Sequence, residues 1–333
     1  PGVHAAPTHP LSPPALAAAA AAGILHPARL YSHQAAALDA AASASLTGRP
    51  VLVTTPTASG KSLCFTLPLA AALAADPGAT ALLLFPTKAL AQDQCRAVNR
   101  ALAAAGVVSD TGAPVAAVFD GDVPRADRAG LLAHARCLLT NPDMLHVTVL
   151  PGLKMGGGGG GGGDGGGPLP VPPGGGWPAF LARLALVAVD EVHAYTGAFG
   201  SHTALVLRRL WRAVDACRGS GGGKPGAAPH PPLPLLIAAS ATVGNAGEHA
   251  ARLLGRGEVT VVDQDGSPAG PRTFVVWRPP PAGGGGERKG GGGAGSPGLA
   301  AAVPPSKAAT AKRARAEAVR AAAAAAERGG GGA

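Results

Sequence analysis

Seven short, almost entirely apolar runs are spread over the central part of the chain, each bounded by polar or turn-forming residues. Runs of this kind predict strands buried on both faces, as in a parallel sheet. Longer alanine-rich stretches between them predict helices, for example at 60–75, 88–105 and 201–216. This alternation predicts an α/β fold with a mostly parallel, doubly wound sheet that binds ligands at the carboxyl ends of its strands. The seven runs are 51–55, 81–85, 115–119, 136–140, 184–189, 235–239 and 259–263.

Low-complexity segments divide the 333-residue chain, which has 51 glycines and 33 prolines. Residues 1–22 are rich in proline and alanine, and we predict that they are disordered. One folded domain is expected at 23–278, with flexible glycine- and proline-rich inserts at 152–176 and 218–232. A low-complexity basic tail is expected at 279–333. Because the first residue is proline rather than methionine, we expect a fragment of a longer protein.

The net charge of +9 is concentrated at one end of the chain. Residues 279–333 hold eight basic and three acidic residues, which favours contact with a polyanion, although a solvated tail without a partner fits equally well. None of the four cysteines forms a CxxC pair, so neither a zinc site nor a redox motif is predicted. No unbroken apolar run reaches the roughly 18 residues of a membrane span, so no membrane partner is expected.

One strand-to-helix junction has the composition of a phosphate-binding loop. The run 51–54 leads through Thr-Pro-Thr-Ala-Ser into Gly-Lys-Ser at an expected helix start. Backbone N–H groups of such a turn point at phosphates, its lysine places a charge on the terminal phosphates, and its serine hydroxyl is a magnesium ligand. Thr55 stands where the general pattern has its first glycine, and Gly-Lys-Ser alone can be an ordinary helix start. The predicted ATP-binding residues here are Thr55, Thr57, Ala58, Ser59, Gly60, Lys61 and Ser62, and Ser62 is a predicted Mg²⁺ ligand.

A second strand, in the run 184–189, ends in two carboxylates and a histidine. Asp190 is expected to hold Mg²⁺, and Glu191 to position and deprotonate the attacking water. With Lys61 they form the predicted catalytic set. Carboxylates also end strands as solvated turn residues, but the phosphate loop upstream favours the catalytic interpretation. His193 is either a structural histidine or a residue that passes the nucleotide state to the rest of the protein.

Several segments, taken in chain order, resemble the motifs of superfamily-two DExH-box helicases: 55–62, 86–94, 140–143, 190–193 and 240–242. Finer matches resemble the branch of MrfA/YprA-type DNA helicases and their fungal Hrq relatives: 30–34, 190–202, 240–245 and 265–268. The resemblance covers about residues 23–280 and implies a single RecA-like lobe.

The resemblance implies roles for residues outside the phosphate loop and the acidic pair. Gln34 would read the adenine edge, and Ser240 and Thr242, with His193, would couple hydrolysis to lobe movement. A further set would touch the nucleic-acid backbone, although each of its members alone is also typical of a turn or a helix cap. This set is Thr87, Lys88, Gly121, Arg125, Thr140 and Asn141.

The chain departs from the family pattern in two places. The link between Pro151 and Trp177 is enlarged by the glycine-rich insert. A second RecA-like lobe is not recognisable, although Thr273–Trp277 resembles its first strand. That lobe would carry the arginine fingers, which supply about a thousandfold or more of rate in related phosphoryl transfer. The predicted partners therefore include a second lobe.

These features predict an ATP-dependent DNA helicase lobe that uses ATP and Mg²⁺, with a role in DNA repair. DNA is favoured over RNA as the nucleic-acid partner. A nuclear location is expected from such a role, with an organelle or the cytoplasm as alternatives. The alternatives in function are an RNA helicase of the DExH class and a non-motor nucleotide-binding or scaffold module. An unrelated phosphate-loop ATPase is disfavoured by the segments 86–88 and 240–242.

Overall fold

The computed structural model describes residues 2–24, 26–109, 114–152, 176–218, 233–268, 270 and 273–277. The chain divides into two compact units, Pro1–Arg272 and Thr273–Ala333. The fold described below is that of the first unit. Apart from Gly152, Gly176 and Arg218, the predicted inserts at 152–176 and 218–232 lie outside the described residues, as does the whole predicted tail at 279–333.

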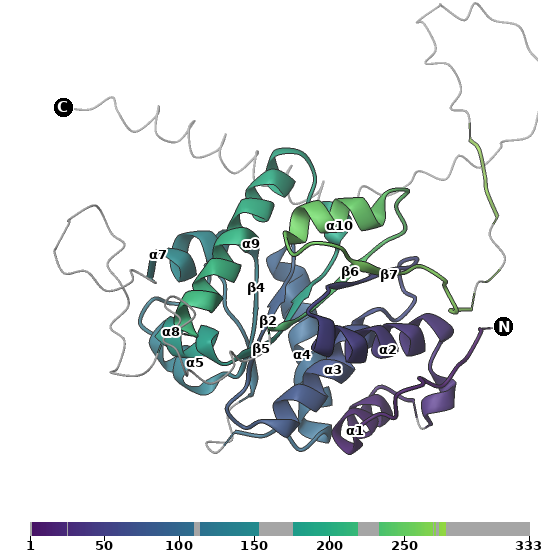
Figure 1. The fold of residues 1–333 in the computed structure, drawn as a ribbon, viewed down its shortest axis with the longest axis horizontal. Coiled ribbons are helices and arrows are strands. Elements are labelled where there is room, and N and C mark those ends of the chain that lie inside the picture. Colours follow the sequence, from purple (N-terminus) through teal and green to yellow (C-terminus); the bar gives the residue numbers. More distant parts are fainter. Residues whose placement is uncertain are drawn as a thin grey trace, which may run out of the picture. The chain divides into compact units, whose positions relative to one another are not determined.

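A seven-stranded sheet, with all strands parallel, forms the centre of the first unit (Figure 1). The spatial order of its strands is β3-β4-β2-β5-β6-β1-β7. Every predicted apolar run is a strand, with ends within two residues of those expected, which confirms the predicted fold class. The strands are β1 Val51–Thr54, β2 Thr80–Leu84, β3 Ala116–Val118, β4 Cys137–Thr140, β5 Leu184–Val189, β6 Leu235–Ser240 and β7 Thr260–Val262.

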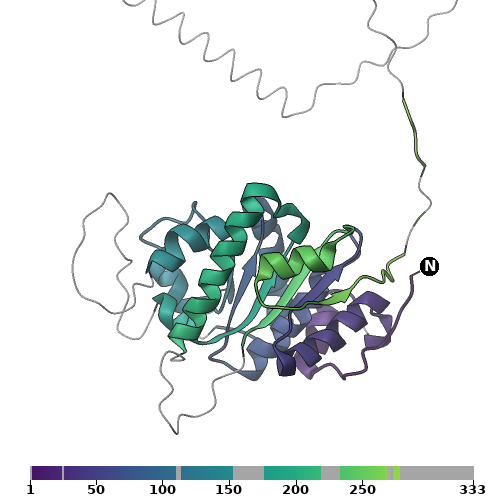
Figure 2. The same ribbon diagram turned by 45° about the horizontal axis from the view of Figure 1, so that its top comes forward.

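Helices cover both faces of the sheet, as Figures 1 and 2 show. One face carries α1 Pro13–Ala21, α2 Ser32–Thr47, α3 Ser62–Ala75 and α4 Lys88–Ala104. The other carries α8 Gly176–Ala182, α9 Gly197–Cys217 and α10 Ala246–Leu254. Shorter elements complete the first unit: η1 Pro27–Arg29, α5 Arg128–His134, α6 Pro142–Met144, η2 Leu145–Val149, α7 Leu150–Gly152 and η3 Val192–Ala194.

Alternate residues of each strand enter different cores, because successive side chains of a strand point to opposite faces. On β2, Ala81 and Leu83 belong to the core beneath α3 and α4, whereas Leu82 and Leu84 belong to the core beneath α8 and α9. All four side chains are fully buried. A strand buried on both faces must be apolar throughout, which explains the unbroken apolar runs in the sequence.

The N-terminal segment differs from the prediction that residues 1–22 are disordered. Helix α1 begins after the N-cap Ser12 and contacts α3 and α4 through buried Ala15, Ala18 and Ala19. Alanine has the highest helix propensity, and its small side chain permits close helix packing, so an alanine-rich stretch can be ordered without large apolar residues. Residues before α1 are held by backbone hydrogen bonds, among them Val3 N to Gly266 O at 2.8 Å.

Among the described residues, no helix is long and apolar enough to cross a membrane.

Candidate nucleotide site and strand-end loops

The carboxyl ends of three neighbouring strands bring the predicted ATP-site motifs together. The phosphate loop follows β1, the acidic pair follows β5, and Ser240–Thr242 begins at the last residue of β6. The sheet order β5-β6-β1 places the third motif between the other two. Segments far apart in the sequence therefore meet at one edge, where parallel sheets bind ligands.

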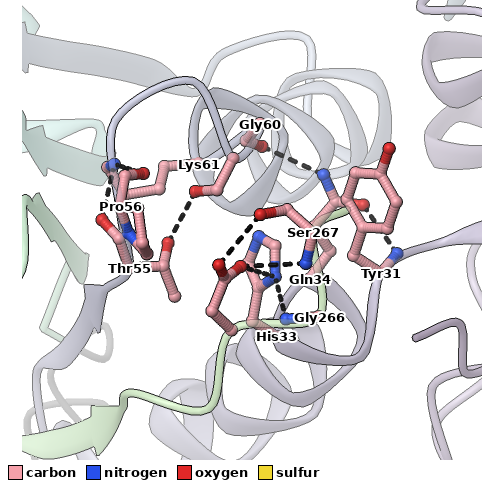
Figure 3. A network of polar contacts seen from close by, with 11 residues as sticks. Tyr31, His33, Gln34, Thr55, Pro56, Gly60, Lys61, Gly266 and Ser267 are labelled. Atoms are coloured by element: carbon pink, nitrogen blue, oxygen red, sulfur yellow. Dashed lines mark hydrogen bonds and ion pairs between the residues drawn. The ribbon is translucent and has the colours of Figure 1, made fainter. Parts of the chain in front are cut away.

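The phosphate loop is closed by hydrogen bonds among its own residues (Figure 3). Lys61 is 8% exposed, and its ammonium donates to the backbone carbonyls of Thr55 at 2.9 Å and Pro56 at 2.7 Å. The Thr55 and Ser59 hydroxyls lie 2.7 Å apart. Thr55, at the position of the missing first glycine, thus contributes a side-chain hydrogen bond across the loop. The predicted residues from Thr55 to Ser62, Thr57 included, form one continuous turn into α3.

Backbone strain is concentrated at the candidate site. Among the described residues, the non-glycine positions with positive φ are Ala58, with φ +63°, and Glu191, with φ +52°. Gly60 also has a positive φ, of +81°. Left-handed backbone is costly for residues with a Cβ, and such strain clusters at functional sites. Turns of this kind present successive N–H groups to an anion, which fits the expected phosphates.

Lys61 and the acidic pair share one electrostatic environment. Burial lowers the pKa of the Lys61 ammonium, while Glu191 and then Asp190 raise it. Burial raises the pKa of Asp190 to about 6; Glu191 adds to this rise, and a backbone hydrogen bond from Glu191 together with the charge of Lys61 opposes it. The lysine and the two carboxylates, distant in the sequence, therefore lie within electrostatic reach of one another, as the motifs predicted.

The donor set at the acidic pair fits a magnesium ion that also binds a nucleotide. One carboxylate oxygen of Asp190 accepts the Glu191 N–H at 2.9 Å, and Glu191 Oε2 is buried without a hydrogen-bond partner. Within the described ranges, no cluster of three or more His, Cys, Asp or Glu side chains could hold a metal by itself. Mg²⁺ is usually held by one or two carboxylates plus substrate phosphates, so the oxygens of Asp190 and Ser62 suit it.

The backbone of Ala241 links the acidic pair to the phosphate-loop strand. Its N–H donates to His193 Nδ1 at 3.1 Å, and its carbonyl accepts from the Thr54 hydroxyl at 3.0 Å. Because Nδ1 accepts this bond, it carries no proton, and Glu191 Oε2 at 3.3 Å receives no hydrogen bond from it. The structure thus joins His193 to the 240–242 segment, and its coupling role stays a prediction.

The side chains of Ser240 and Thr242, also expected to couple hydrolysis to movement, take no part in the hydrogen bonds of this link. Ser240 is buried, and its Oγ has no hydrogen-bond partner among the described residues. Thr242 is exposed. Thr54 and Ala241, which make the observed link, were missed by the sequence analysis because their contacts use the backbone of a small apolar residue and an inconspicuous strand-end threonine.

Gln34 lies in the first turn of α2 against the phosphate loop (Figure 3). Its Nε2 donates to the Gly60 carbonyl at 3.1 Å, and its Oε1 accepts from the Tyr31 N–H at 3.0 Å. An amide offers two donors and two acceptor lone pairs, so one of each remains. The side chain is therefore fixed in place with hydrogen-bonding capacity to spare, which suits a base-reading residue.

The predicted nucleic-acid residues lie on the other half of the same sheet edge, after β2, β3 and β4. Thr87 caps α4, its hydroxyl accepting from Leu90 N at 3.4 Å. The Lys88 ammonium is exposed and forms an ion pair with Asp122 at 2.7 Å. Gly121 lies beside this lysine, since a Cβ built on it would be 3.5 Å from Lys88 Nζ.

Two further residues predicted to contact nucleic acid, Thr140 and Asn141, form hydrogen bonds within the protein. Thr140 is buried, and its hydroxyl donates to the Phe119 carbonyl. Asn141 caps α6 by accepting from Met144 N at 2.9 Å. These side chains fix the strand-end loops in the described conformation. Arg125 lies in the turn that precedes α5 and is exposed.

Comparison with known proteins gives relatives that extend well beyond this chain. The chain is 37% identical over 249 residues to the ATP-dependent helicase HRQ1 of Saccharomyces cerevisiae, covering 75% of this chain and 20% of the relative. It is 34% identical over 251 residues to YprA of Bacillus subtilis, described as an uncharacterized ATP-dependent helicase, covering 75% of this chain and 28% of the relative. The chain thus spans less than a third of either protein.

The fold is similar to solved structures of the DUF1998 helicase MrfA. A crystal structure of MrfA bound to DNA and AMPPNP matches with a TM-score of 0.62 and 32% identity, over 81% of this chain and 31% of that one. A second structure, bound to DNA, matches with a TM-score of 0.61. The DEAD/DEAH box helicase family matches residues 31–248, which hold the phosphate loop, the acidic pair and the 240–242 segment, and the chain belongs to that family.

Proposed function

We propose that this chain is the ATP-binding first lobe of an ATP-dependent DNA helicase that acts in DNA repair. The observation that carries the proposal is the shared environment of Lys61, Asp190 and Glu191 beside a turn with strained backbone. The similarity to MrfA, whose solved structures hold DNA, supports DNA rather than RNA as the track.

The residues divide the work of ATP hydrolysis among them. The loop backbone around Ala58 and Gly60 binds the phosphates. When ATP binds, the Lys61 ammonium leaves the carbonyls of Thr55 and Pro56 and places its charge on the phosphates instead. Glu191 orients a water for in-line attack on the γ phosphorus and accepts its proton. Mg²⁺, held by Ser62 and Asp190, would neutralise charge on the phosphates.

ATP hydrolysis is coupled to DNA binding because the nucleotide site and the DNA-contacting loops lie along the same edge of the sheet. β2 lies next to β5, which carries the acidic pair, and β4 and β3 follow in that order along the same edge. His193 and Thr54 both bind the backbone of Ala241, so a shift of His193, two residues after Glu191, reaches the β6 loop. A second RecA-like lobe would complete the track and supply the arginines that stabilise the transition state.

The test compares the polypeptide 1–333 with the same protein joined to a second lobe. We expect the 1–333 polypeptide to bind a fluorescent ATP analogue but to hydrolyse ATP about a thousandfold more slowly, because arginine fingers are worth that much. Equal turnover would contradict a two-lobe motor. Unwinding of matched DNA and RNA duplexes by the two-lobe protein shows which nucleic acid is its substrate. Equal or better unwinding of RNA would overturn the DNA assignment.

A further inference from the structure

The Asp265–Pro268 segment follows β7 and has no role in the proposed function. The Ser267 N–H and hydroxyl each donate to the Asp265 carboxylate at 2.9 Å. An aspartate that binds the backbone two residues on forms a tight turn of its own. This turn directs the Gly266 N–H at Nδ1 of His33, 3.3 Å away in the first turn of α2 (Figure 3).

Only glycine fits at position 266, because any side chain there would clash with its neighbours. A Cβ built on it would lie 2.2 Å from Ser32 Oγ and 2.6 Å from the Val3 carbonyl. Its own carbonyl accepts from Val3 N at 2.8 Å. The close approach of three chain segments, from the N-terminus, α2 and the loop after β7, therefore depends on the missing side chain.

His33 is buried, with 1% of its surface exposed, and lies between this turn and the phosphate loop. Burial lowers its pKa, and Lys61 lowers it further, while the Asp265 carboxylate, 3.5 Å from Nδ1, and a backbone hydrogen bond with Ser59 raise it. Nε2 has no partner of good hydrogen-bond geometry, so the Ser59 bond is a weak one. A neutral ring that accepts at Nδ1 fits the Gly266 N–H.

The neighbouring Gln34 is the side chain that this arrangement holds in place. Gln34 reaches Gly60 and Tyr31 from the same helical turn as His33. A Cβ on Gly60 would lie 2.7 Å from Gln34 Nε2, so small movements of the α2 start would change this contact. The hydrogen bond from Gly266 N–H to His33 Nδ1 connects the first turn of α2 to the loop after β7.

We propose that His33, Asp265, Gly266 and Ser267 form a brace in which His33 is a positioning residue for the base-reading amide of Gln34. The inference rests on the proposed function, since it assigns the brace to nucleotide selection. Its consequence is selectivity for adenine over guanine, because only a fixed amide can discriminate between their edges, which present opposite donor and acceptor patterns.

The experiment uses the polypeptide 1–333 and fluorescent N-methylanthraniloyl derivatives of ATP and GTP, with inorganic tripolyphosphate as a competitor. The wild type should bind ATP more tightly than GTP. His33→Ala should lose about tenfold in ATP affinity, the range of one buried hydrogen bond, and lose its preference over GTP. His33→Asn, which retains an acceptor for Gly266, should stay within about threefold of wild type.

Tripolyphosphate separates positioning from general damage, because it uses the phosphate loop without the base. Its affinity should be the same in His33→Ala and wild type. The matched control is Asp263→Asn in the same loop, whose carboxylate contacts the adjacent Gln264 side chain and lies outside the brace; it should behave as wild type. An unchanged ATP-to-GTP ratio in His33→Ala, equal binding of both nucleotides by wild type, or a parallel loss of tripolyphosphate would overturn the brace.

Hydrogen–deuterium exchange of the nucleotide-free protein distinguishes failure of the brace from failure of the proposed function. His33→Ala should speed exchange at 263–268 and at the start of α2 but not in the middle of α9, and His33→Asn should restore protection. If no nucleotide binds to wild type, the proposed function fails, while this measurement still decides whether the brace exists. Unchanged exchange at 263–268 in His33→Ala would overturn it.

Discussion

The two halves of the sheet's carboxyl edge are built in different ways. On the β5-β6-β1 half, Lys61 is buried, Asp190 and Glu191 are half-buried and share its electrostatic environment, and the Ala241 backbone connects His193 to Thr54. On the β3-β4-β2 half, Lys88 and Asp122 form an exposed ion pair, the buried Asp120 accepts from the Asp122 N–H, and Thr140 and Asn141 bond internally. The first half has the enclosed, charged character that suits a small ligand, whereas the second presents an exposed surface.

This difference implies different responses to substitution. Buried groups that act on developing charge have large effects, because little water screens them. An exposed ion pair contributes little and is weakened further by salt. Substitutions on the nucleotide half should therefore change activity by orders of magnitude, and those on the other half by small factors.

The largest effect is expected from Glu191→Gln, measured in the two-lobe protein. Loss of the general base should lower the ATP turnover rate about a thousandfold while nucleotide affinity stays within a few-fold of wild type. Single-turnover hydrolysis and fluorescent nucleotide titration measure the two quantities separately. A variant that retains a tenth of wild-type turnover would show that another group takes the proton.

Lys61→Ala should have the next largest effect, on binding itself. The ammonium is the buried cation of the loop, so its removal should weaken ATP affinity by about a hundredfold, a typical cost for a charge-assisted phosphate contact. Circular dichroism should show an unchanged helix content, since the loop lies outside α3. Tight ATP binding by this variant would show that the phosphate loop is not part of the ATP site.

Asp190→Asn should change the pH dependence of stability in buffer with a chelator and no nucleotide. The folded-state pKa of about 6 lies above the ordinary value of 3.8, so the folded protein binds the proton more tightly. The stabilisation from this protonation is complete below pH 3.8 and is lost as the pH rises through about 6. The variant should therefore be more stable than wild type at pH 8, by roughly 3 kcal/mol.

Thermal unfolding at pH 8 and at pH 4 measures this change, and the gain should shrink toward zero at the lower pH. Asp143→Asn, in the first turn of α6, serves as the control, because it removes a carboxylate outside the nucleotide site. A destabilised Asp190→Asn at pH 8 would contradict a carboxylate whose charge is disfavoured by burial.

The smallest effects are expected at the exposed pair. Asp122→Asn should free Lys88 for phosphate contact and tighten binding to single-stranded DNA about two- to fivefold at low salt, whereas Lys88→Ala should weaken it by a similar factor. Fluorescence anisotropy at two salt concentrations measures both. Asp127→Asn removes a negative charge close in sequence but leaves the Lys88–Asp122 pair intact. An equal gain in DNA affinity from this control would show that net charge, and not release of Lys88, causes the effect.

Much of the fold was predictable because its strands are buried on both faces. Such strands must be apolar over their whole length, which made all seven visible. The ordered N-terminus was missed because alanine-rich sequence carries little periodicity, and burial of Ala18 depends on what α3 and α4 present to it. The convergence of Lys61 with Asp190 and Glu191 was predictable from motif chemistry, since phosphate and magnesium restrict the residue types that serve them, and the catalytic roles stay predictions.

The sequence by itself determined the seven strands and the charged motifs that follow several of them, because apolar runs and charged motifs are local patterns. Only the tertiary structure decided which strand ends are neighbours. The placement of β6 between β5 and β1 brings Ala241 between His193 and Thr54, and the return of the chain after β7 brings Gly266 to His33. These contacts use backbone groups and small residues, which carry no side-chain signature, so they arise only when distant segments pack.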